Sequence, residues 1–278
     1  GFNQAAHGII NIVSAPLGAL ILDLVGVEGS LVIDVATASL AVAIIAFIAI
    51  PRQQKLIQRG GDWFRTILHD MHDGLKYLLA WKGLVVLTMI ALVFKMALSP
   101  ALSLIPLLVY EHLGGNAAQY SLVEVAMGVG IILGGLLLGI WGGFKKRIYT
   151  MFTGALGVGL GILMLGFLPE NKFYWILPPM FLAGFMVPIV DGPIMAIMQA
   201  RIENEYQGRV MSLFGSLINL SGPIGLIAAG PVADRLGLQV WFITAGVLVI
   251  TSVMYGLFNK HLMSIDTSPI NGKQSPQV

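Results

Sequence analysis

Long apolar segments recur along the chain and alternate with shorter polar stretches that hold most of the charged residues. Each apolar segment has about 20 residues, the length that an α-helix needs to cross roughly 30 Å of hydrocarbon. The pattern predicts an all-α membrane protein with about eight transmembrane helices. The predicted spans are residues 5–25, 31–50, 83–110, 120–142, 149–168, 176–200, 210–231 and 240–258.

Composition supports a membrane location and narrows the possible chemistry. The chain is 56% hydrophobic and 11% charged, with a mean hydropathy of +0.84, which is far too apolar for a soluble domain of 278 residues. Its 14 acidic and 16 basic residues nearly balance, so its net charge gives no reason to expect a nucleic-acid partner. It contains no cysteine, which excludes disulfides and cysteine-ligated metals within it.

The basic residues are distributed unevenly over the two sides that these spans define. Of the 16 Lys and Arg, only Lys95, Lys172 and Arg235 lie outside four segments of one side. By the positive-inside rule that side is cytoplasmic. We therefore expect a multi-pass membrane protein with both termini of this chain in the cytoplasm. The four segments are residues 51–82, 143–148, 201–209 and 259–278.

Residues 51–82 form the only long polar connection between predicted spans. Its basic residues, Arg52 and Lys55 among them, can meet anionic head groups. Trp63 and Phe64 begin a stretch whose pattern fits an amphipathic helix in the membrane interface. The alternative is a solvated linker between two helix bundles.

Two apolar segments near opposite ends of the chain are interrupted by proline and glycine in the same order. Pro16 and Gly18 stand in the first, and Pro223 and Gly225 in the second. Interrupted apolar segments at corresponding places in two halves are typical of transporters built from duplicated bundles. These four residues are candidate points at which helices bend, and static close packing of helices is the alternative.

Several motifs in the second half of the chain occur in the order and spacing of a known family. They are GPIMAIMQ at residues 192–199, QGRVMSL at 207–213, SGPIGL at 221–226 and AGPVAD at 229–234. They resemble the tenth and eleventh helices of the major facilitator superfamily, in its macrolide-efflux and enterobactin-exporter-like branch of drug:proton antiporters. Residues 33–36 and 72–78 resemble the start of that family's sixth helix and the end of its central loop.

The resemblance implies how the chain is organised. The eight spans would be family helices five to twelve, so the chain would be an N-terminally truncated member that lacks four helices. Two family motifs are altered: residues 139–147 keep glycine and basic residues but lack the acid, and residues 15–19 keep only part of a fifth-helix motif. The implied parts are the last two helices of the N-terminal bundle (1–50), the cytoplasmic central loop (51–82), a C-terminal six-helix bundle (83–258) and a disordered cytoplasmic tail (259–278).

Ionisable residues inside the predicted spans are the first candidates for function, because a charge in hydrocarbon costs roughly 2.5–3.5 kcal/mol on insertion scales. Asp191 and Lys95 fall near mid-membrane, and Glu124 lies nearer the outer end. Asp191, between Pro188 and Pro193, is a candidate proton-coupling site. A purely structural ion pair between Asp191 and Lys95 is the alternative.

The remaining candidates follow from the resemblance or from their depth. The resemblance implies that Gln199 donates to substrate oxygens if it faces the cavity, and that Gly208 and Arg209 brace an inward gate. Simple anchoring by positive charge is the alternative for Arg209. Glu124 fits a cavity rim better than a proton relay. Asp34, near the start of its predicted span, fits a helix N-terminal cap.

No enzyme chemistry emerges from the sequence. It has no nucleophile elbow, HExxH pair or P-loop, so we expect no cofactor and no metal, and uphill transport by this chain would use an ion gradient. The resemblance implies a monomeric secondary exporter of macrolide-type amphiphiles that works by proton antiport and alternating access. The alternatives are a siderophore or metabolite exporter of the same superfamily, and a degenerate non-transporting scaffold or sensor.

Overall fold

The computed structural model describes residues 21, 25, 26, 28–44 and 63–266. They belong to two compact units, one containing residues 1–12 and 70–278 and the other residues 13–69. Pro16, Gly18 and most of the predicted span 5–25 lie outside the described residues. The same holds for the end of the predicted tail, residues 267–278.

The smaller unit contains a helix over residues 28–44. The hydroxyl of Ser30 donates to the carbonyl oxygen of Gly26 at 2.7 Å, and that of Thr37 to the carbonyl oxygen of Ile33 at 2.9 Å. These bonds run back one helical turn, so the helix is already formed before Asp34. The expectation that Asp34 caps a helix N-terminus is therefore wrong.

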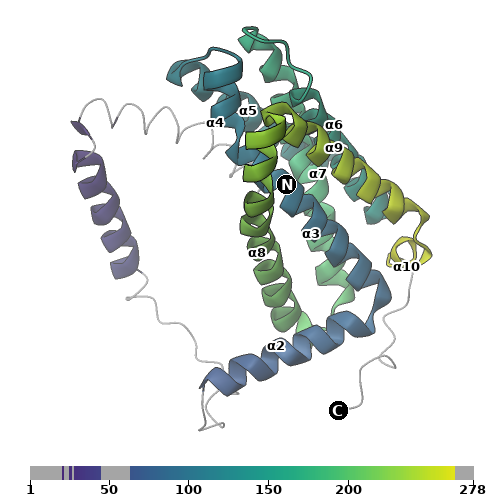
Figure 1. The fold of residues 1–278 in the computed structure, drawn as a ribbon. Coiled ribbons are helices and arrows are strands. Elements are labelled where there is room, and N and C mark those ends of the chain that lie inside the picture. The colour runs from purple at the N-terminus through teal and green to yellow at the C-terminus, as the bar shows by residue number, and fades with distance from the viewer. Residues whose placement is uncertain (1–20, 22–24, 27, 45–62, 267–278) are drawn as a thin grey trace. The chain divides into compact units, whose positions relative to one another are not determined.

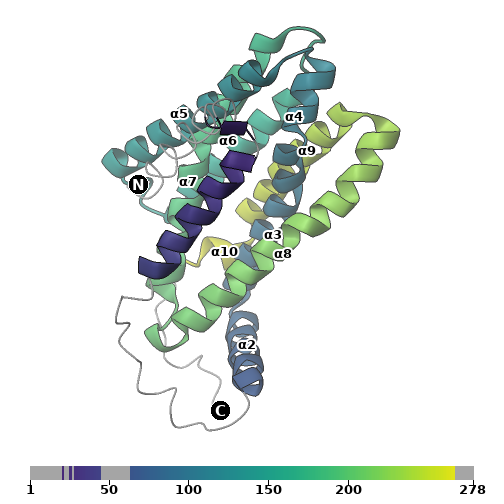
Figure 2. The same cartoon turned by 90° about the vertical axis from the view of Figure 1, so that its left-hand side faces the viewer.

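Six helical stretches in the larger unit are long and apolar enough to cross a membrane (Figures 1 and 2). They coincide with the last six predicted spans, and the described residues contain no β-strand. The chain is thus an all-α, multi-pass membrane protein, as its hydropathy predicts. The six spans are Lys82–His112, Ala117–Trp141, Arg147–Leu165, Phe173–Arg201, Glu205–Leu236 and Leu238–Phe258.

Two of the spans are composite, and the others are single helices. The first span consists of α3 (Lys82–Ser103), α4 (Ile105–Leu107) and a π-helical turn, η2 (Leu108–His112). The fourth consists of a 3₁₀ turn, η3 (Phe173–Ile176), and α7 (Leu177–Arg201). The single helices are α5 (Ala117–Trp141), α6 (Arg147–Leu165), α8 (Asn204–Leu236) and α9 (Leu238–Phe258). Two shorter helices flank the spans, α2 (Trp63–Ala80) and α10 (Lys260–Met263).

Close helix contacts in the bundle depend on glycine. α7 packs along both α5 and α6, and α3 packs along α8 and α9. A Cβ atom on Gly134 of α5 would overlap the carbonyl oxygen of Phe185 in α7. One on Gly225 of α8 would overlap the carbonyl oxygen of Met96 in α3. The segment with Pro223 and Gly225 is therefore a tight α3–α8 contact, and α8 continues through the proline.

The first residues of the predicted tail are ordered and packed. Asn259 caps α10, because its side-chain oxygen accepts from the amides of His261 and Leu262 at 3.1 and 3.2 Å. Leu262 and Ile265 are fully buried. A carboxylate oxygen of Asp266 accepts from the backbone amide of Ile148 at 3.0 Å. The expectation of disorder from residue 259 is therefore wrong up to Asp266, since apolar burial and hydrogen bonds fix this segment.

The predicted connection 51–82 is helical over α2, as its amphipathic pattern indicates. Residues 70–80 of α2 belong to the larger unit and cross one end of the bundle, where α3 and α8 begin and α7 ends (Figures 1 and 2). Leu78 of α2 is only 4% exposed and belongs to the bundle core. This end of the bundle is called the α2 end below.

Candidate functional site

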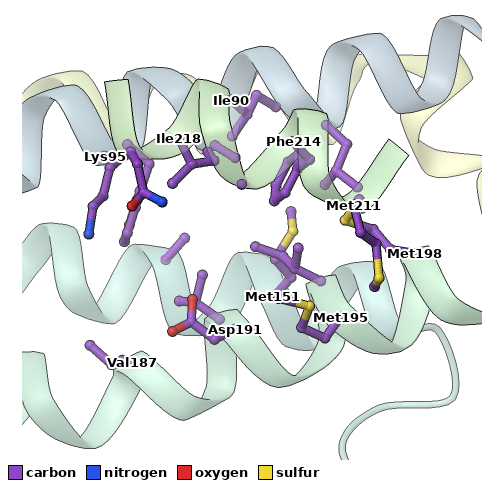
Figure 3. A pocket seen from close by; sticks show the side chains of 18 residues that line it. Ile90, Lys95, Met151, Val187, Asp191, Met195, Met198, Met211, Phe214 and Ile218 are labelled. Atoms are coloured by element: carbon purple, nitrogen blue, oxygen red, sulfur yellow. The ribbon is translucent and has the colours of Figure 1, made fainter. Parts of the chain in front are cut away.

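The larger unit contains a cavity of about 380 Å³ between α3, α6, α7 and α8 (Figure 3). Most of its lining side chains are apolar, and three are polar or charged: Lys95, Asp191 and Asn219. Four methionines, Met151, Met195, Met198 and Met211, and two phenylalanines, Phe94 and Phe214, make up much of the rest. Thioether side chains are flexible and polarisable, so such walls adapt to ligands of different shape.

Helical periodicity explains why these residues face one space. α7 contributes Val187, Val190, Asp191, Ile194, Met195 and Met198, which recur every three or four positions. α8 contributes Met211, Phe214, Gly215, Ile218 and Asn219 with the same spacing. Residues three and four positions apart lie on one face of a helix. The cavity is therefore formed by one continuous stripe from each helix.

Asp191 and Lys95 approach the cavity from different helices. Figure 3 shows Lys95 extending from α3 and Asp191 from α7, while the labelled methionines gather toward the α2 end. Asp191 is exposed, and Lys95 is partly buried. The two side chains share the cavity without forming an ion pair with each other or with another described residue. Two opposite charges thus stand apart in one mostly apolar space.

Proline shapes the helix around Asp191. Pro188 and Pro193 both lie inside α7 and are buried. Each removes one backbone donor from the helical ladder, so carbonyl groups one turn earlier lose their usual partners near the carboxylate. Gly192, beside Asp191, lets the side chain of Leu138 in α5 come close to the α7 backbone. The acid therefore stands where α7 is least constrained by its own hydrogen bonds.

The structure does not bring Glu124 and Gln199 to this cavity. Glu124 of α5 is half-buried and accepts a hydrogen bond from the Tyr120 hydroxyl at 2.9 Å. The Tyr120 ring lies 6.2 Å from that of Tyr110. Gln199 is exposed, and its backbone carbonyl accepts from the Gln207 side chain at 3.4 Å. Neither side chain lines the space that holds Asp191 and Lys95.

Asn219 and the four methionines were not identified from the sequence. Asn219 is uncharged, so a search for ionisable residues in apolar segments passes over it. Its spacing could have placed it in the cavity, because Asn219 lies four and eight residues after Gly215 and Met211 and so shares their helical face. Met195 and Met198 likewise follow Asp191 by four and seven residues.

Arg209 makes a contact at the α2 end that the sequence did not predict. Its Nη1 atom lies 3.4 Å from a carboxylate oxygen of Asp73 in α2. The rings of Tyr77 in α2 and Tyr206 in α8 stack with centroids 4.9 Å apart. Gly74 permits this approach, because a Cβ there would lie 3.2 Å from the carbonyl oxygen of Arg209. These residues, Asp73, Gly74, Tyr77, Tyr206 and Arg209, are called the α2–α8 contact below. Gly208, in contrast, faces open space.

Tyr77 also accepts a hydrogen bond in the α2–α8 contact. The backbone amide of Glu203 donates to its hydroxyl oxygen at 3.4 Å. Partial burial raises the pKa of Tyr77, because it disfavours the phenolate. Tyr77 is therefore neutral at physiological pH.

Other basic residues at the α2 end bind backbone carbonyl groups. Arg147 donates to the carbonyl oxygen of Ala196 in the last turns of α7 at 2.7 Å. Arg201 donates to the backbone carbonyl of Asp266. Cations near a helix C-terminus interact favourably with its unpaired carbonyl groups and dipole. No group of three or more metal-binding side chains occurs among the described residues, which are 21, 25, 26, 28–44 and 63–266.

The bundle of apolar spans with a mixed apolar and charged cavity defines a multi-pass membrane protein with an internal cavity. A family model described as Major Facilitator Superfamily matches residues 1–226 and 83–274. The chain belongs to this family. The resemblance recognised in its motifs is thereby confirmed.

Curated relatives include efflux proteins. The chain is 32% identical over 250 residues to "Macrolide efflux protein A" of Streptococcus pyogenes, covering 90% of this chain and 61% of that protein. It is 30% identical over 226 residues to a protein of the same name from Enterococcus faecalis, covering 81% and 69%. It is 26% identical over 275 residues to "Multidrug efflux pump Tap" of Mycobacterium tuberculosis, covering 96% and 63%. The chain thus spans 61% of the length of the streptococcal relative.

Proposed function

We propose that the protein is a secondary exporter of amphiphilic compounds of the macrolide type. The names of its relatives support drug efflux, and the cavity between α3, α6, α7 and α8 supports it most directly. Its methionine and phenylalanine walls suit apolar ligands of variable shape. Its separated charges suit the polar end of an amphiphile.

Asp191 is the coupling residue in this proposal. Its carboxylate reaches the cavity from a proline-interrupted part of α7 and makes no ion pair with Lys95. It is therefore available to three competing cations: a proton, the Lys95 ammonium and a cationic group of the substrate. Competition between a proton and a substrate for one carboxylate is the simplest physical basis for antiport.

The α2 end faces the cytoplasm of a bacterial cell in this proposal. Arg147, Arg201 and Arg209 all make contacts at this end. The positive-inside rule places basic segments such as theirs in the cytoplasm. Transport by alternating access would open the cavity to either side in turn, by rocking of whole helices. We propose a monomer as the transporting unit, because the cavity forms within one chain.

Lys95 supports one alternative substrate class. A lysine ammonium in the cavity would bind carboxylate or catecholate oxygens, which siderophores and acidic metabolites carry. Export of such an anion would use Lys95 as the binding residue and Asp191 as its competitor.

The test is the accumulation of labelled erythromycin in cells that express the protein, with and without a proton uncoupler. A proton-driven exporter lowers accumulation, and the uncoupler restores it to the level of cells with empty vector. Equal accumulation in both kinds of cell, with the protein present in the membrane, would reject macrolide export. The same assay with a labelled siderophore would then test the alternative.

A further inference from the structure

The C-terminal turns of α2 use one side of the helix to bind the bundle. Leu78 is buried in the core, and Gly74 lies against the backbone of Arg209 in α8. Asp73 pairs with Arg209, and Tyr77 stacks on Tyr206. Residues 73, 74, 77 and 78 share one side of a helix, as their spacing requires. This side of α2 packs against the bundle, with Asp73 and Tyr77 partly buried.

A second side of α2 is apolar and exposed. Met71 is 48% exposed, Leu75 42% and Leu79 57%. These residues are spaced by four, so they form a line along the helix, and this line borders the buried line of Gly74 and Leu78. Ordered apolar side chains in a row at the edge of a packed contact mark an interaction site. They are called the Met71–Leu79 stripe below.

The stripe lies where a membrane surface would be. Only Trp81 separates α2 from α3, whose first residue, Lys82, begins a membrane-crossing span. Residues 70–80 of α2 run across the end of the bundle and not along it (Figures 1 and 2). Trp81 at this corner fits the interfacial belt in which tryptophan is enriched. The apolar stripe thus ends beside the corner at which the chain enters its first membrane-crossing span of the larger unit.

The charges beside the stripe favour an anionic surface. Each residue lies about 100° further round the helix than the one before it, so Lys76 stands on the far side of the stripe from the bundle. Lys76 and Lys82 are both exposed. Asp73, an acid in the same turns, is engaged by Arg209. An apolar stripe bordered by lysine is the pattern of a helix that lies in the headgroup layer of an anionic leaflet.

We propose that α2 is an in-plane membrane anchor whose Met71–Leu79 stripe inserts into the headgroup layer of anionic phospholipids, while its opposite side holds α8 through the α2–α8 contact. The anchor does not depend on which compound the protein transports. It fixes the end of α8 that leads into the cavity to the level of the membrane surface.

Spin-label accessibility tests the anchor directly. The chain has no cysteine, so Leu75→Cys provides a single attachment site within it. Ala80→Cys is the matched control, because Ala80 is exposed on the same helix but lies on a different face from the Met71–Leu79 stripe. Both proteins are reconstituted in vesicles of phosphatidylethanolamine and phosphatidylglycerol. Collision rates are then measured with oxygen, which concentrates in lipid, and with a water-soluble nickel chelate.

The anchor predicts an oxygen-to-nickel collision ratio several-fold higher at position 75 than at position 80. A similar ratio at both positions would mean that the stripe faces water and would overturn the proposal. A label at position 75 that neither probe reaches would also overturn it, because another protein segment would then cover the stripe. Replacing phosphatidylglycerol by phosphatidylcholine, or making Lys76→Gln with Lys82→Gln, should lower the ratio at position 75. No change in either arm would overturn the preference for anionic lipid.

Discussion

Polar groups at the α2 end and polar groups in the cavity are arranged in opposite ways. At the α2 end, Arg209 binds Asp73, and Arg147 binds a carbonyl of α7. In the cavity, Asp191 and Lys95 stay apart, with no ion pair to any residue that the structure describes. Paired groups hold helices in place, whereas an unpaired charge in an apolar space is costly and marks a candidate for function. The contrast separates the part of the bundle that positions helices from the part for which we propose a binding role.

Asp191→Asn should have the largest effect. The amide keeps the size of the side chain but can neither take up a proton nor balance a cation, so energy-dependent efflux should fall by more than about tenfold. Uptake of labelled erythromycin with and without uncoupler measures it. Glu124→Gln is the control, because Glu124 is an acid within a span that does not line the cavity. If the Asp191→Asn protein is expressed normally and exports as fast as the natural protein, Asp191 is not the coupling residue.

Lys95→Gln should change which compounds are exported. Without the ammonium, Asp191 faces no competing protein cation, so permanently cationic compounds such as tetraphenylphosphonium should be exported several-fold faster. Acidic compounds should be exported more slowly. The comparison is made by resistance and uptake, with Lys172→Gln at the opposite end of the bundle as the control. An equal change for cations and anions would show that Lys95 acts only in packing.

Tyr77→Ala should loosen the α2–α8 contact. Loss of the ring stack and of its packing should cost about 1–2 kcal/mol in the docking of α2. Hydrogen exchange of residues 70–80 should become faster by about tenfold. Tyr77→Phe keeps the ring and should exchange nearly as slowly as the natural protein. Unchanged exchange in Tyr77→Ala would mean that other contacts hold α2.

Arg209→Gln should have a smaller effect on the same contact. The Arg209 and Asp73 side chains are 37% and 23% exposed, so solvent screens the pair and its coupling energy should be about 0.2–1 kcal/mol. A double-mutant cycle with Asp73→Asn, read by hydrogen exchange of α2, measures the coupling. The coupling should shrink at high salt. A salt-independent coupling would indicate a hydrogen bond without a charge contribution.

The pH dependence of α2 docking should be the smallest effect. Burial raises the pKa of Tyr77, so the undocked chain ionises at about pH 10 while the docked chain still holds its proton. Docking should therefore be constant up to about pH 10 and weaken above it. Tyr77→Phe should remove this Tyr77 contribution to the alkaline loss. A fluorescence reporter on α2, titrated in both proteins, measures the difference, and coincident curves would contradict this role of Tyr77.

Hydropathy predicted well where the spans of the larger unit lie along the chain, and it predicted poorly which side chains face the cavity. The six spans of the larger unit match because crossing hydrocarbon requires a length and an apolarity that any single segment displays. The α8 helix begins at Asn204, earlier than the predicted 210, since polar residues such as Gln207 and Arg209 extend it beyond the apolar core.

The contents of the cavity were harder to predict. A helix in a membrane bundle is apolar both toward lipid and toward its neighbours, so periodicity does not reveal which side faces a cavity. Asp191 and Lys95 were identified because a charged residue in an apolar segment is unusual whichever way its side chain points. Glu124 is equally unusual, but it accepts a hydrogen bond from Tyr120 and does not line the cavity. Asn219 has no charge and was missed. The order of residues 259–266 was missed because it rests on burial of Leu262 and Ile265 against distant parts of the chain.

The proline-free stretch of α8 between residues 204 and 222 links the two regions mechanically. Tyr206 in the α2–α8 contact and Asn219 in the cavity are about 20 Å apart along this rod, at 1.5 Å per residue. A tilt of only about 5° about one end would move the other by about 2 Å over that length. If α2 is held still, the end of α8 at Tyr206 is fixed, and a small tilt of the helix moves Asn219 in the cavity. A distance probe between α2 and the far end of α8 would then report cavity occupancy without any labelled ligand.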